Sequence, residues 1–232
     1  MNKYGILEDE SSRVLFEKIN KRLICGKCYS DRKVFETRDQ KGHGCRSNLL
    51  PGFSSGKIDK PIDILIVAEA HGGGRPEDFR PQKDLDYEVS WLGDYYLESP
   101  LKRFHQQQVR NLLNKLSYAG KTWVFTDLIK CFVWHGSNSE LNGRDNWMIA
   151  IRHCSGYLEE QMSLLQPHMV LGLGGTVAQY FKLDKPKHGS IHGVSINGNH
   201  TVYVHSLFPT QWTADRWVSE NGWELVIPKL LV

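Results

Sequence analysis

The sequence lacks any apolar run of about 18 residues or more, the length at which a helix can begin to span a membrane. It also lacks a strong charge of either sign, because its 232 residues carry a net charge of only +3. This balance permits a nucleic-acid partner without requiring one. The first residues, MNKYGILEDESSR, contain acidic side chains and no apolar core segment, so they do not predict a secretory signal. We therefore expect a cytoplasmic protein with no membrane contact.

Cysteine is scarce, with five in the chain. Disulfides are rare in the cytoplasm, so thiols at recognisable spacing favour metal or redox chemistry. Cys25 and Cys28 form a CxxC pair, and Cys131 and Cys154 follow far downstream. Four thiolates can hold either a tetrahedral zinc ion or a four-iron cluster, and spacing alone does not separate the two. Cys45 is the odd residue, and we expect a free thiol there.

The apolar pattern predicts strands that alternate with helices. The predicted strands are 62–68, 122–126, 169–173, 191–196 and 201–207. The predicted helices are 9–24, one from Ser99–Pro100 to Gly120, 147–165, a short one ending at Phe181, and 213–232 with interruptions near Gly222 and Pro228. This alternation favours one three-layer α/β/α domain over residues 1–232, with a central, mostly parallel four-stranded sheet. Residues 1–60 are expected to form an N-terminal helix and an extension that binds the metal or cluster.

The first candidate site residue is Glu69, which directly follows the predicted strand at 62–68. His71 and three consecutive glycines come next, so the backbone of this loop can approach a ligand closely. Open α/β sheets place their chemistry at the carboxyl ends of their strands. The alternative is an ordinary exit from a strand into a loop.

Two further segments follow predicted strands, namely Asp127 and the run from His205 to Thr210. In a doubly wound sheet such strand ends converge on one crevice. Glu69 could orient a water molecule or stabilise a cationic transition state there, and Asp127 could accept hydrogen bonds from a ligand. The alternative for Asp127 is a structural hydrogen bond in a cap or loop.

Taken in order, the motifs resemble a known family. The chain reads CxxC, then VAEA, FTDLIKC, the block YLEEQMSLLQPHMVLGLGGTVAQ, and VYVHSLFPT. This order resembles the iron–sulfur branch of the uracil-DNA glycosylase superfamily, typified by the family 4 enzymes, from about Cys25 to Trp217. The resemblance implies an α/β/α fold and hydrolysis of the N-glycosidic bond of a flipped-out base. It also implies a 4Fe-4S cluster, with structural zinc as the alternative, on Cys25, Cys28, Cys131 and Cys154.

The departures from the family pattern affect the implied site. The family motif GEAPG reads here AEAH, so the resemblance keeps Glu69 as a catalytic residue beside a remodelled loop with His71. The base-stacking aromatic is matched best by Trp91 in the segment SWLG. The final motif begins with His-Pro-Ser in the family, whereas this chain has Phe208-Pro-Thr210. His205 is then the histidine that could substitute in assisting the departing base, with a structural role as the alternative.

The pocket asparagine of the family is Asp127 in this chain. An asparagine amide both donates and accepts, so it matches uracil, whereas an ionised carboxylate only accepts. Asp127 therefore predicts a base with an amino group, namely a cytosine derivative, with uracil as the second candidate. The remodelled HGGG loop suggests room for a larger base, such as the 5-hydroxymethyl- or glucosylated cytosine of phage DNA. Such an activity would give abasic sites and serve antiphage defence, whereas uracil excision would serve base-excision repair.

We expect the partner to be DNA and the protein to be a monomer. The resemblance places Gln211 and Trp212 where the family inserts its wedge into the duplex. Basic residues are candidate phosphate neighbours, with a solvated basic surface as the alternative: Lys182, Lys185, Lys187, His188 and Arg216. Two rival functions come from other classes: a non-catalytic DNA-binding module, and a nucleotide-binding protein stabilised by zinc.

Overall fold

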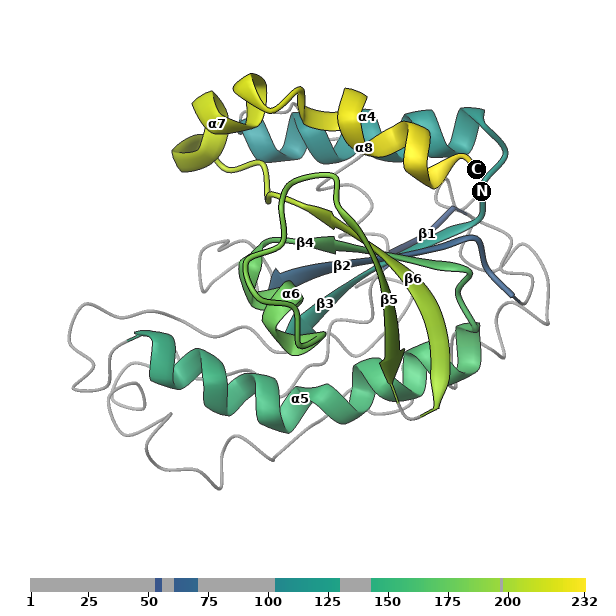
Figure 1. The fold of residues 1–232 in the computed structure, drawn as a ribbon, viewed down its shortest axis with the longest axis vertical. Coiled ribbons are helices and arrows are strands. Elements are labelled where there is room, and N and C mark those ends of the chain that lie inside the picture. Colours follow the sequence, from purple (N-terminus) through teal and green to yellow (C-terminus); the bar gives the residue numbers. More distant parts are fainter. Residues whose placement is uncertain (1–52, 56–60, 71–102, 130–142, 197) are drawn as a thin grey trace, which may run out of the picture.

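The computed structural model describes residues 53–55, 61–70, 103–129, 143–196 and 198–232. These residues form one six-stranded sheet in the order β1-β3-β2-β4-β6-β5 (Figure 1). The strands are β1 (Phe53–Ser54), β2 (Ile64–Ala70), β3 (Trp123–Ile129), β4 (Met169–Leu173), β5 (Ile191–Ile196) and β6 (Asn199–Ser206). The helices are α4 (Phe104–Tyr118), α5 (Gly143–Leu165), α6 (Gly175–Tyr180), the 3-10 turn η4 (Gln211–Thr213), α7 (Ala214–Ser219) and α8 (Gly222–Leu230).

The predicted fold class is confirmed, with a correction to the number of strands. The four central strands β3, β2, β4 and β6 run parallel, as expected. The sheet is extended at both edges by antiparallel strands, the two-residue β1 and the hairpin strand β5. Ile196 pairs with Asn199 across the hairpin, and Gly198 between them has a positive φ of 80° that suits a tight turn.

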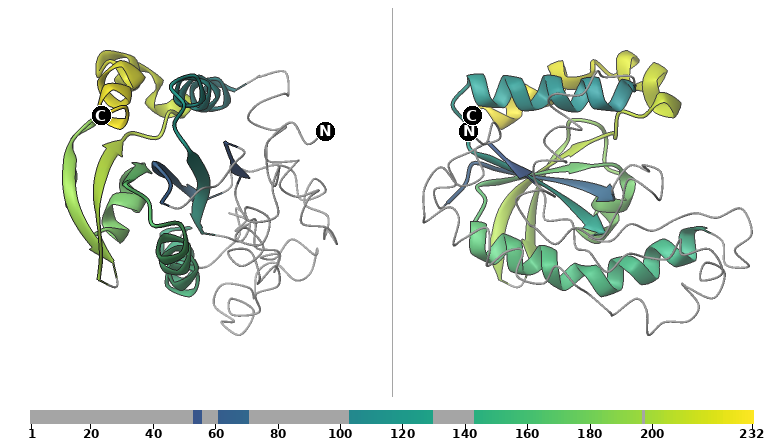
Figure 2. Two further views of the ribbon diagram at one scale, coloured as in Figure 1. Left: turned by 90° about the vertical axis from the view of Figure 1, so that its right-hand side faces the viewer. Right: turned by 180° about the vertical axis from the view of Figure 1, so that it is seen from behind.

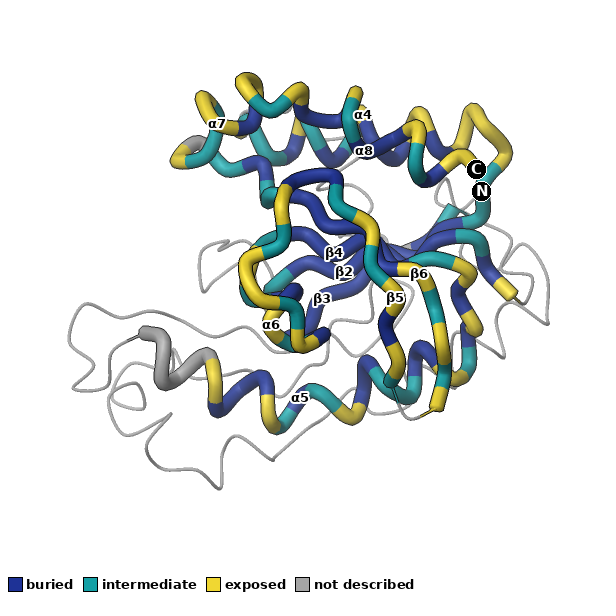
Figure 3. Tube along the Cα trace, in the orientation of Figure 1, coloured by how far each residue is buried: buried dark blue, intermediate teal, exposed yellow. Residues whose placement is uncertain are grey.

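Two helical layers cover the sheet. Figures 1 and 2 show α4, α7 and α8 on one face and α5 with α6 on the other. Figure 3 shows buried segments alternating with exposed ones along α4, α5 and α8, the pattern of helices with one face on the core. In α4 the buried residues are Gln106, Val109, Leu112, Leu113 and Leu116, the spacing of an amphipathic helix. Within the residues that the structure describes, no helix is long and apolar enough to cross a membrane.

Some helix boundaries differ from the predicted ones. Helix α4 begins at Phe104 and not at Ser99–Pro100, because the side chain of Gln106 accepts a hydrogen bond from the backbone N–H of Arg103 at 3.2 Å and caps the helix there. The break at Gly222 is confirmed, but α8 continues through Pro228 to Leu230. The predicted helix at 9–24 and the extension up to residue 52 lie outside the described residues.

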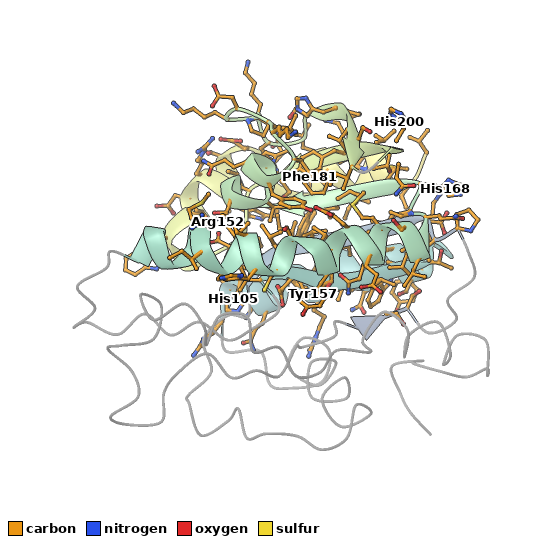
Figure 4. The ribbon with its side chains drawn as sticks, turned by 90° about the horizontal axis from the view of Figure 1, so that it is seen from below. His105, Arg152, Tyr157, His168, Phe181 and His200 are labelled. Carbon is orange, nitrogen blue, oxygen red and sulfur yellow. The ribbon has the colours of Figure 1, made fainter. Side chains whose placement is uncertain are left out.

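The register of β2 and β3 is fixed at their amino ends by one carboxylate. Thr122 donates both its backbone N–H and its hydroxyl to Oδ2 of Asp63, each at 2.8 Å. Burial alone would raise the pKa of Asp63, but these hydrogen bonds and the charge of Lys121 lower it on balance. Figure 4 marks this amino edge of the sheet by His168 and His200, which lie at the end of the molecule away from Arg152.

The centre of the sheet depends on the absence of a side chain at Gly172. An alanine Cβ at this position would lie 2.0 Å from the hydroxyl oxygen of Tyr203, which is itself fully buried. We therefore expect Gly172→Ala to lower the free energy of unfolding by about 3 kcal/mol or more in a urea titration, because the core cannot expand without strain. The matched control is Gly156→Ala on α5, where an added Cβ meets open space. This substitution should raise the free energy of unfolding by about 0.5–1 kcal/mol, because alanine favours a helix more than glycine does. Equal stabilities of the two variants would contradict this packing.

Candidate active site at the carboxyl edge of the sheet

The carboxyl ends of the parallel strands are held together by the turn after β4. The backbone N–H of Gly174 donates to the carbonyl oxygen of Ser206, at the end of β6, at 2.8 Å. Gly174 has a φ of 95°, which glycine adopts without strain. A Cβ at Gly174 would lie 3.6 Å from Cβ of Phe208, so the chain after β6 passes directly beside this turn. The turn after β4 and the chain after β6 therefore lie side by side at this edge.

Glu69 is the penultimate residue of β2 and is half-buried at this edge. Burial raises the pKa of its carboxyl group above the ordinary value, and a hydrogen bond from the side chain of Thr176 opposes the rise. Thr176 is the second residue of α6, so the carboxylate lies against the helix that follows β4. A half-buried carboxylate at this edge can act as a base or as a partner for a developing cation.

Asp127 lies inside β3 with only 5% of its surface exposed. It pairs with Ala68 in the neighbouring strand, one residue before Glu69. The preceding residue, Thr126, donates its hydroxyl to Gln161 of α5 at 3.2 Å and so faces the α5 layer. Because successive side chains of a strand alternate, Asp127 faces the opposite layer, which contains α4 and α8.

This register decides which face of the sheet each carboxylate occupies. Val67 pairs with Thr126, so Glu69, two residues later, shares the α5 and α6 face, in agreement with its contact to Thr176. The two carboxylates therefore leave the sheet on opposite faces at the same edge. A ligand that contacts both must lie across the end of the strands. The segments 71–102 and 130–142, which follow β2 and β3, are outside the described residues.

His205 lies in β6 on the same face as Glu69. It pairs with Gly172, which pairs with Val67, so these residues form one row across the sheet. The imidazole is 2% exposed, and its ring is stacked near that of Tyr203, with the ring centroids 6.2 Å apart and an angle of 15° between the planes. Burial, reinforced by neighbouring positive groups, lowers the pKa of His205 to about 4. His205 is thus neutral at pH 7 and cannot act there as a positively charged acid.

The Phe-Pro-Thr motif connects β6 to the exposed turn η4. Thr213 donates its hydroxyl to the carbonyl of Phe208 at 2.7 Å, and the N–H of Thr210 donates to the hydroxyl of Thr213 at 2.9 Å. The ring of Phe208 also lies 6.1 Å from that of His105, at the start of α4. These contacts bring β6, α4 and η4 together at the edge that carries Asp127 and Glu69.

Thr176 and His105 were not among the predicted site residues. Thr176 sits in the segment LGLGGT, for which the sequence favours a tight strand-to-helix turn that could also offer backbone N–H groups to a DNA phosphate. His105 lies at the start of an amphipathic helix, where its pattern is that of a surface residue, yet burial and the charge of Arg103 lower its pKa. Both belong to elements that reach the edge through tertiary packing, which a single sequence does not encode as a motif.

Several predicted site residues cannot be placed. His71, Trp91, Cys25, Cys28 and Cys131 all lie outside the described residues, as does Cys45. Of the predicted cluster ligands, the structure describes Cys154, which is fully buried in α5 within the hydrophobic core. Among the described residues, no three histidine, cysteine or acidic side chains are grouped so that they could hold a metal ion. The cluster therefore remains a prediction.

The predicted DNA-contact residues lie beside the Phe-Pro-Thr motif or on the surface. Gln211 and Trp212 form η4, and the Trp212 side chain is 88% exposed. Lys187 is exposed, and Arg216 is exposed but forms an ion pair with Glu220, with 2.6 Å between Nε and Oε1. An exposed indole and nearby cations are compatible with contact to a nucleic acid.

The prediction that His188 contacts a DNA phosphate is wrong, because both of its ring nitrogens are bound within the protein. Its Nδ1 accepts the N–H of Leu207 at 3.2 Å, so Nε2 carries the proton and donates to the carbonyl of Gly222 at 2.9 Å. The ring is 6% exposed and lies against Trp217. His188 therefore anchors the basic loop to β6 and α8.

A cavity of about 500 Å³ lies between α4 and the α7–α8 pair. Aromatic and amide side chains line it, namely Phe104, Gln108, Asn111, Asn114, Trp217 and Trp223. Neither Glu69 nor Asp127 contributes to its wall. We therefore do not include this cavity in the candidate active site.

Comparison with known proteins identifies the family of this chain. No curated protein matches the chain closely enough to count as a relative. The profile of the uracil DNA glycosylase superfamily, by contrast, matches residues 57–225, a range that contains every described strand from β2 to β6. Members of that superfamily are DNA glycosylases, which are hydrolases that act on DNA. Since the match covers well over half of the 232 residues, the chain belongs to the uracil DNA glycosylase superfamily.

Proposed function

We propose that this protein hydrolyses the N-glycosidic bond of a flipped-out, cytosine-type base in DNA. The observation that carries the proposal is the position of Glu69, a half-buried carboxylate at the carboxyl edge of the sheet. The chain belongs to the uracil DNA glycosylase superfamily, whose members are DNA glycosylases. Carboxyl edges are where open α/β sheets bind their ligands. The superfamily supplies the class of reaction, and Asp127 supplies the reason to favour one base over another.

The proposed hydrolysis depends mainly on one negatively charged side chain close to the sugar. The bond between C1′ of the sugar and the base nitrogen breaks, and its electron pair leaves with the base. The sugar then carries positive charge, which the carboxylate of Glu69 would stabilise. Glu69 would also orient the water whose oxygen bonds to C1′, and the proton released by that water balances the charge on the departing base. The products are the free base and an abasic site.

Asp127 would select the base. An ionised carboxylate accepts hydrogen bonds but does not donate them, so it matches the exocyclic amino group of cytosine and repels O4 of uracil. One well-placed contact of this kind is worth about 1–3 kcal/mol of discrimination. The substrate would then be a modified cytosine, such as the 5-hydroxymethyl or glucosylated form in phage DNA, and the enzyme would act in antiphage defence. Uracil excision in DNA repair is the alternative.

Base flipping would rely on the segments beside the site. Extracting a nucleotide from the stack costs a few kcal/mol, which an inserted side chain can offset by filling the gap. Trp212 is the candidate wedge because it is exposed next to the Phe-Pro-Thr motif, and Gln211 precedes it in the same turn. Lys187 and Arg216 would contact phosphates. Trp91 would stack on the freed base, and His71, or His205 as a neutral hydrogen-bond donor, would assist its departure.

We also propose that Cys25, Cys28, Cys131 and Cys154 hold a 4Fe-4S cluster that anchors the N-terminal segment to the sheet. Thiolates are the ligands that such clusters prefer, and the buried Cys154 is compatible with a ligand in a dry environment. Protein purified without oxygen should contain iron and sulfide in equal amounts and show visible absorbance. A colourless protein with stoichiometric zinc would establish the zinc alternative instead.

The proposed function is tested by incubating the full-length protein with duplexes that differ in one base. The panel carries uracil, cytosine, 5-hydroxymethylcytosine or glucosylated 5-hydroxymethylcytosine, and alkali then cuts the strand at any abasic site. We expect cutting at a modified cytosine and none at ordinary cytosine. Cutting at uracil alone would contradict the role given to Asp127. Binding without cutting on any duplex would favour the non-catalytic DNA-binding module.

A further inference from the structure

The cavity between α4 and the α7–α8 pair has a buried hydrogen-bond donor on its wall. Trp217 lines this cavity of about 500 Å³ with only 3% of its surface exposed. Trp223, on the same wall, donates its indole N–H to the carbonyl of Gln108 at 2.6 Å. For Trp217, by contrast, no atom among the described residues accepts a hydrogen bond from the indole N–H. A buried tryptophan N–H normally has such a partner, so this one is available to a ligand.

The N–H of Trp217 lies next to a glycine of the cavity wall. Gly222 also lines the cavity, and a Cβ at this position would lie 2.7 Å from Nε1 of Trp217. Glycine therefore leaves the N–H uncovered on this side. The indole is held in place by an edge-to-face contact with Trp223, with 4.6 Å between ring centroids, and by the ring of His188 at 5.1 Å. The donor is thus positioned before any ligand arrives.

Amide side chains surround this donor. They come from α4 and from the residue before α8: Gln108, Asn111, Asn114 and Asn221. The three on α4 are spaced three residues apart, which places them along one side of the helix. Among the described residues, none accepts or donates a hydrogen bond to these side-chain amides. Each amide can both donate and accept, so the wall offers paired hydrogen-bonding groups beside the indole N–H.

The charges and the apolar groups of the wall narrow the class of ligand. Lys115 and Glu224 are its charged residues, and their opposite charges give no net attraction for a phosphate or a cation. Burial of the amides against a wholly apolar ligand would cost free energy. Trp217 and Trp223 are too deeply buried to offer a ring face to a nucleobase. A neutral sugar fits, because its hydroxyls both donate and accept and its C–H groups can pack on Phe104.

We propose that this cavity binds a sugar residue, held by the indole N–H of Trp217 and the amides of α4. Its volume lies within the range of about 300–1,000 Å³ that is usual for small-ligand sites. Figures 1 and 2 show α4, α7 and α8 together on one face of the sheet, and the cavity between them includes neither Glu69 nor Asp127. Sugar binding is therefore separate from the glycosylase function and does not depend on it. The same chemistry would accept a free saccharide or a sugar carried on DNA.

The direct test is an NMR titration of the 15N-labelled full-length protein, followed through the indole N–H signals. The probes are methyl α-D-glucoside, methyl β-D-glucoside and methyl α-D-mannoside, with cytidine and inorganic phosphate for comparison. Trp217→Phe identifies the Trp217 signal. We expect a saturable shift of that signal with at least one glycoside, whereas the indole of Trp123, which donates to Ser117, should not shift. A shift with cytidine or phosphate alone, or with no probe, would overturn the proposal.

A pair of surface substitutions tests the amides without disturbing the core. Asn111→Leu combined with Asn114→Leu removes two exposed amides of α4. We expect the affinity for the glycoside, measured by calorimetry, to fall by about tenfold or more, the loss of roughly two hydrogen bonds. Gln179→Leu, which removes an exposed amide of α6, should leave the affinity unchanged. An unchanged affinity in the double variant would overturn the proposal, and this result does not require Trp217→Phe to fold.

The double variant also separates the two sources of the sugar. A sugar carried on DNA predicts tighter binding of a duplex with glucosylated 5-hydroxymethylcytosine than of the same duplex with 5-hydroxymethylcytosine, and loss of this difference in the double variant. A free saccharide predicts glycoside binding with no change in the affinity for either duplex. Glycoside binding by a protein that releases no base from any duplex would uphold the sugar site and refute the glycosylase function. Base release without glycoside binding would do the reverse.

Discussion

Replacing Glu69 with glutamine should abolish base release while DNA binding persists. The amide keeps the size of the side chain but removes the negative charge that would stabilise the sugar cation and orient the water. We expect the single-turnover rate of base release to fall by about a thousandfold, the range found for a catalytic general base or an electrostatic stabiliser. The measurement is the rate of abasic-site formation with enzyme in excess, together with the affinity for the same duplex.

The control for this change is Glu160→Gln on α5. Glu160 is a partly exposed glutamate on a helix and has no role in the proposed site. The same substitution there should leave the rate of base release unchanged. An active Glu69→Gln enzyme would contradict the assignment of the catalytic carboxylate, whereas a variant that lost both activity and DNA binding would indicate a structural role.

Replacing Asp127 with asparagine should change which base is removed. The amide gains the ability to donate to O4 of uracil and to accept from its N3–H, so uracil becomes a matched base. We expect the ratio of kcat/KM for the cytosine-type substrate to that for uracil to fall by about tenfold or more. The measurement is that ratio, determined on two duplexes that differ in this one base.

The test of Asp127→Asn depends on whether its activity rises or falls on the cytosine-type substrate and on uracil. Because Asp127 is buried at the sheet edge, the variant must first show a cooperative unfolding transition like that of the unchanged protein. If a folded variant lost activity on both bases, Asp127 would be needed to maintain the structure of the site and not to select the base. An unchanged ratio would show that base identity is read elsewhere.

Much of the fold could be predicted from local patterns. The strand expected at 62–68 is observed as Ile64–Ala70, and the one at 122–126 as Trp123–Ile129. These runs are apolar on both faces, which is typical of central parallel strands. The edge strand β5 is also observed as predicted, at Ile191–Ile196, whereas the edge strand β1 was not predicted because its two residues carry no pattern. The start of α4 also depends on a side-chain cap by Gln106, a contact that ordinary capping rules do not rank first.

The site could be predicted only in part, for a physical reason. A sequence shows that Glu69 and Asp127 follow apolar runs, but not how the two strands are aligned. A shift of one residue in that alignment would move Asp127 to the face of Glu69. The observed pairing of Ala68 with Asp127 places the two carboxylates on opposite faces. The packing of α6 against β2 is likewise a tertiary contact without a local signal in the sequence.

The central claim is that one substrate nucleotide lies across the carboxyl edge of the sheet, between Glu69 and Asp127. The most direct measurement is a crystal structure of the Glu69→Gln enzyme bound to a duplex that carries the preferred base. The account predicts a flipped nucleotide whose exocyclic amino group lies within hydrogen-bonding distance of Asp127 and whose C1′ faces residue 69. A base bound away from either side chain would contradict it.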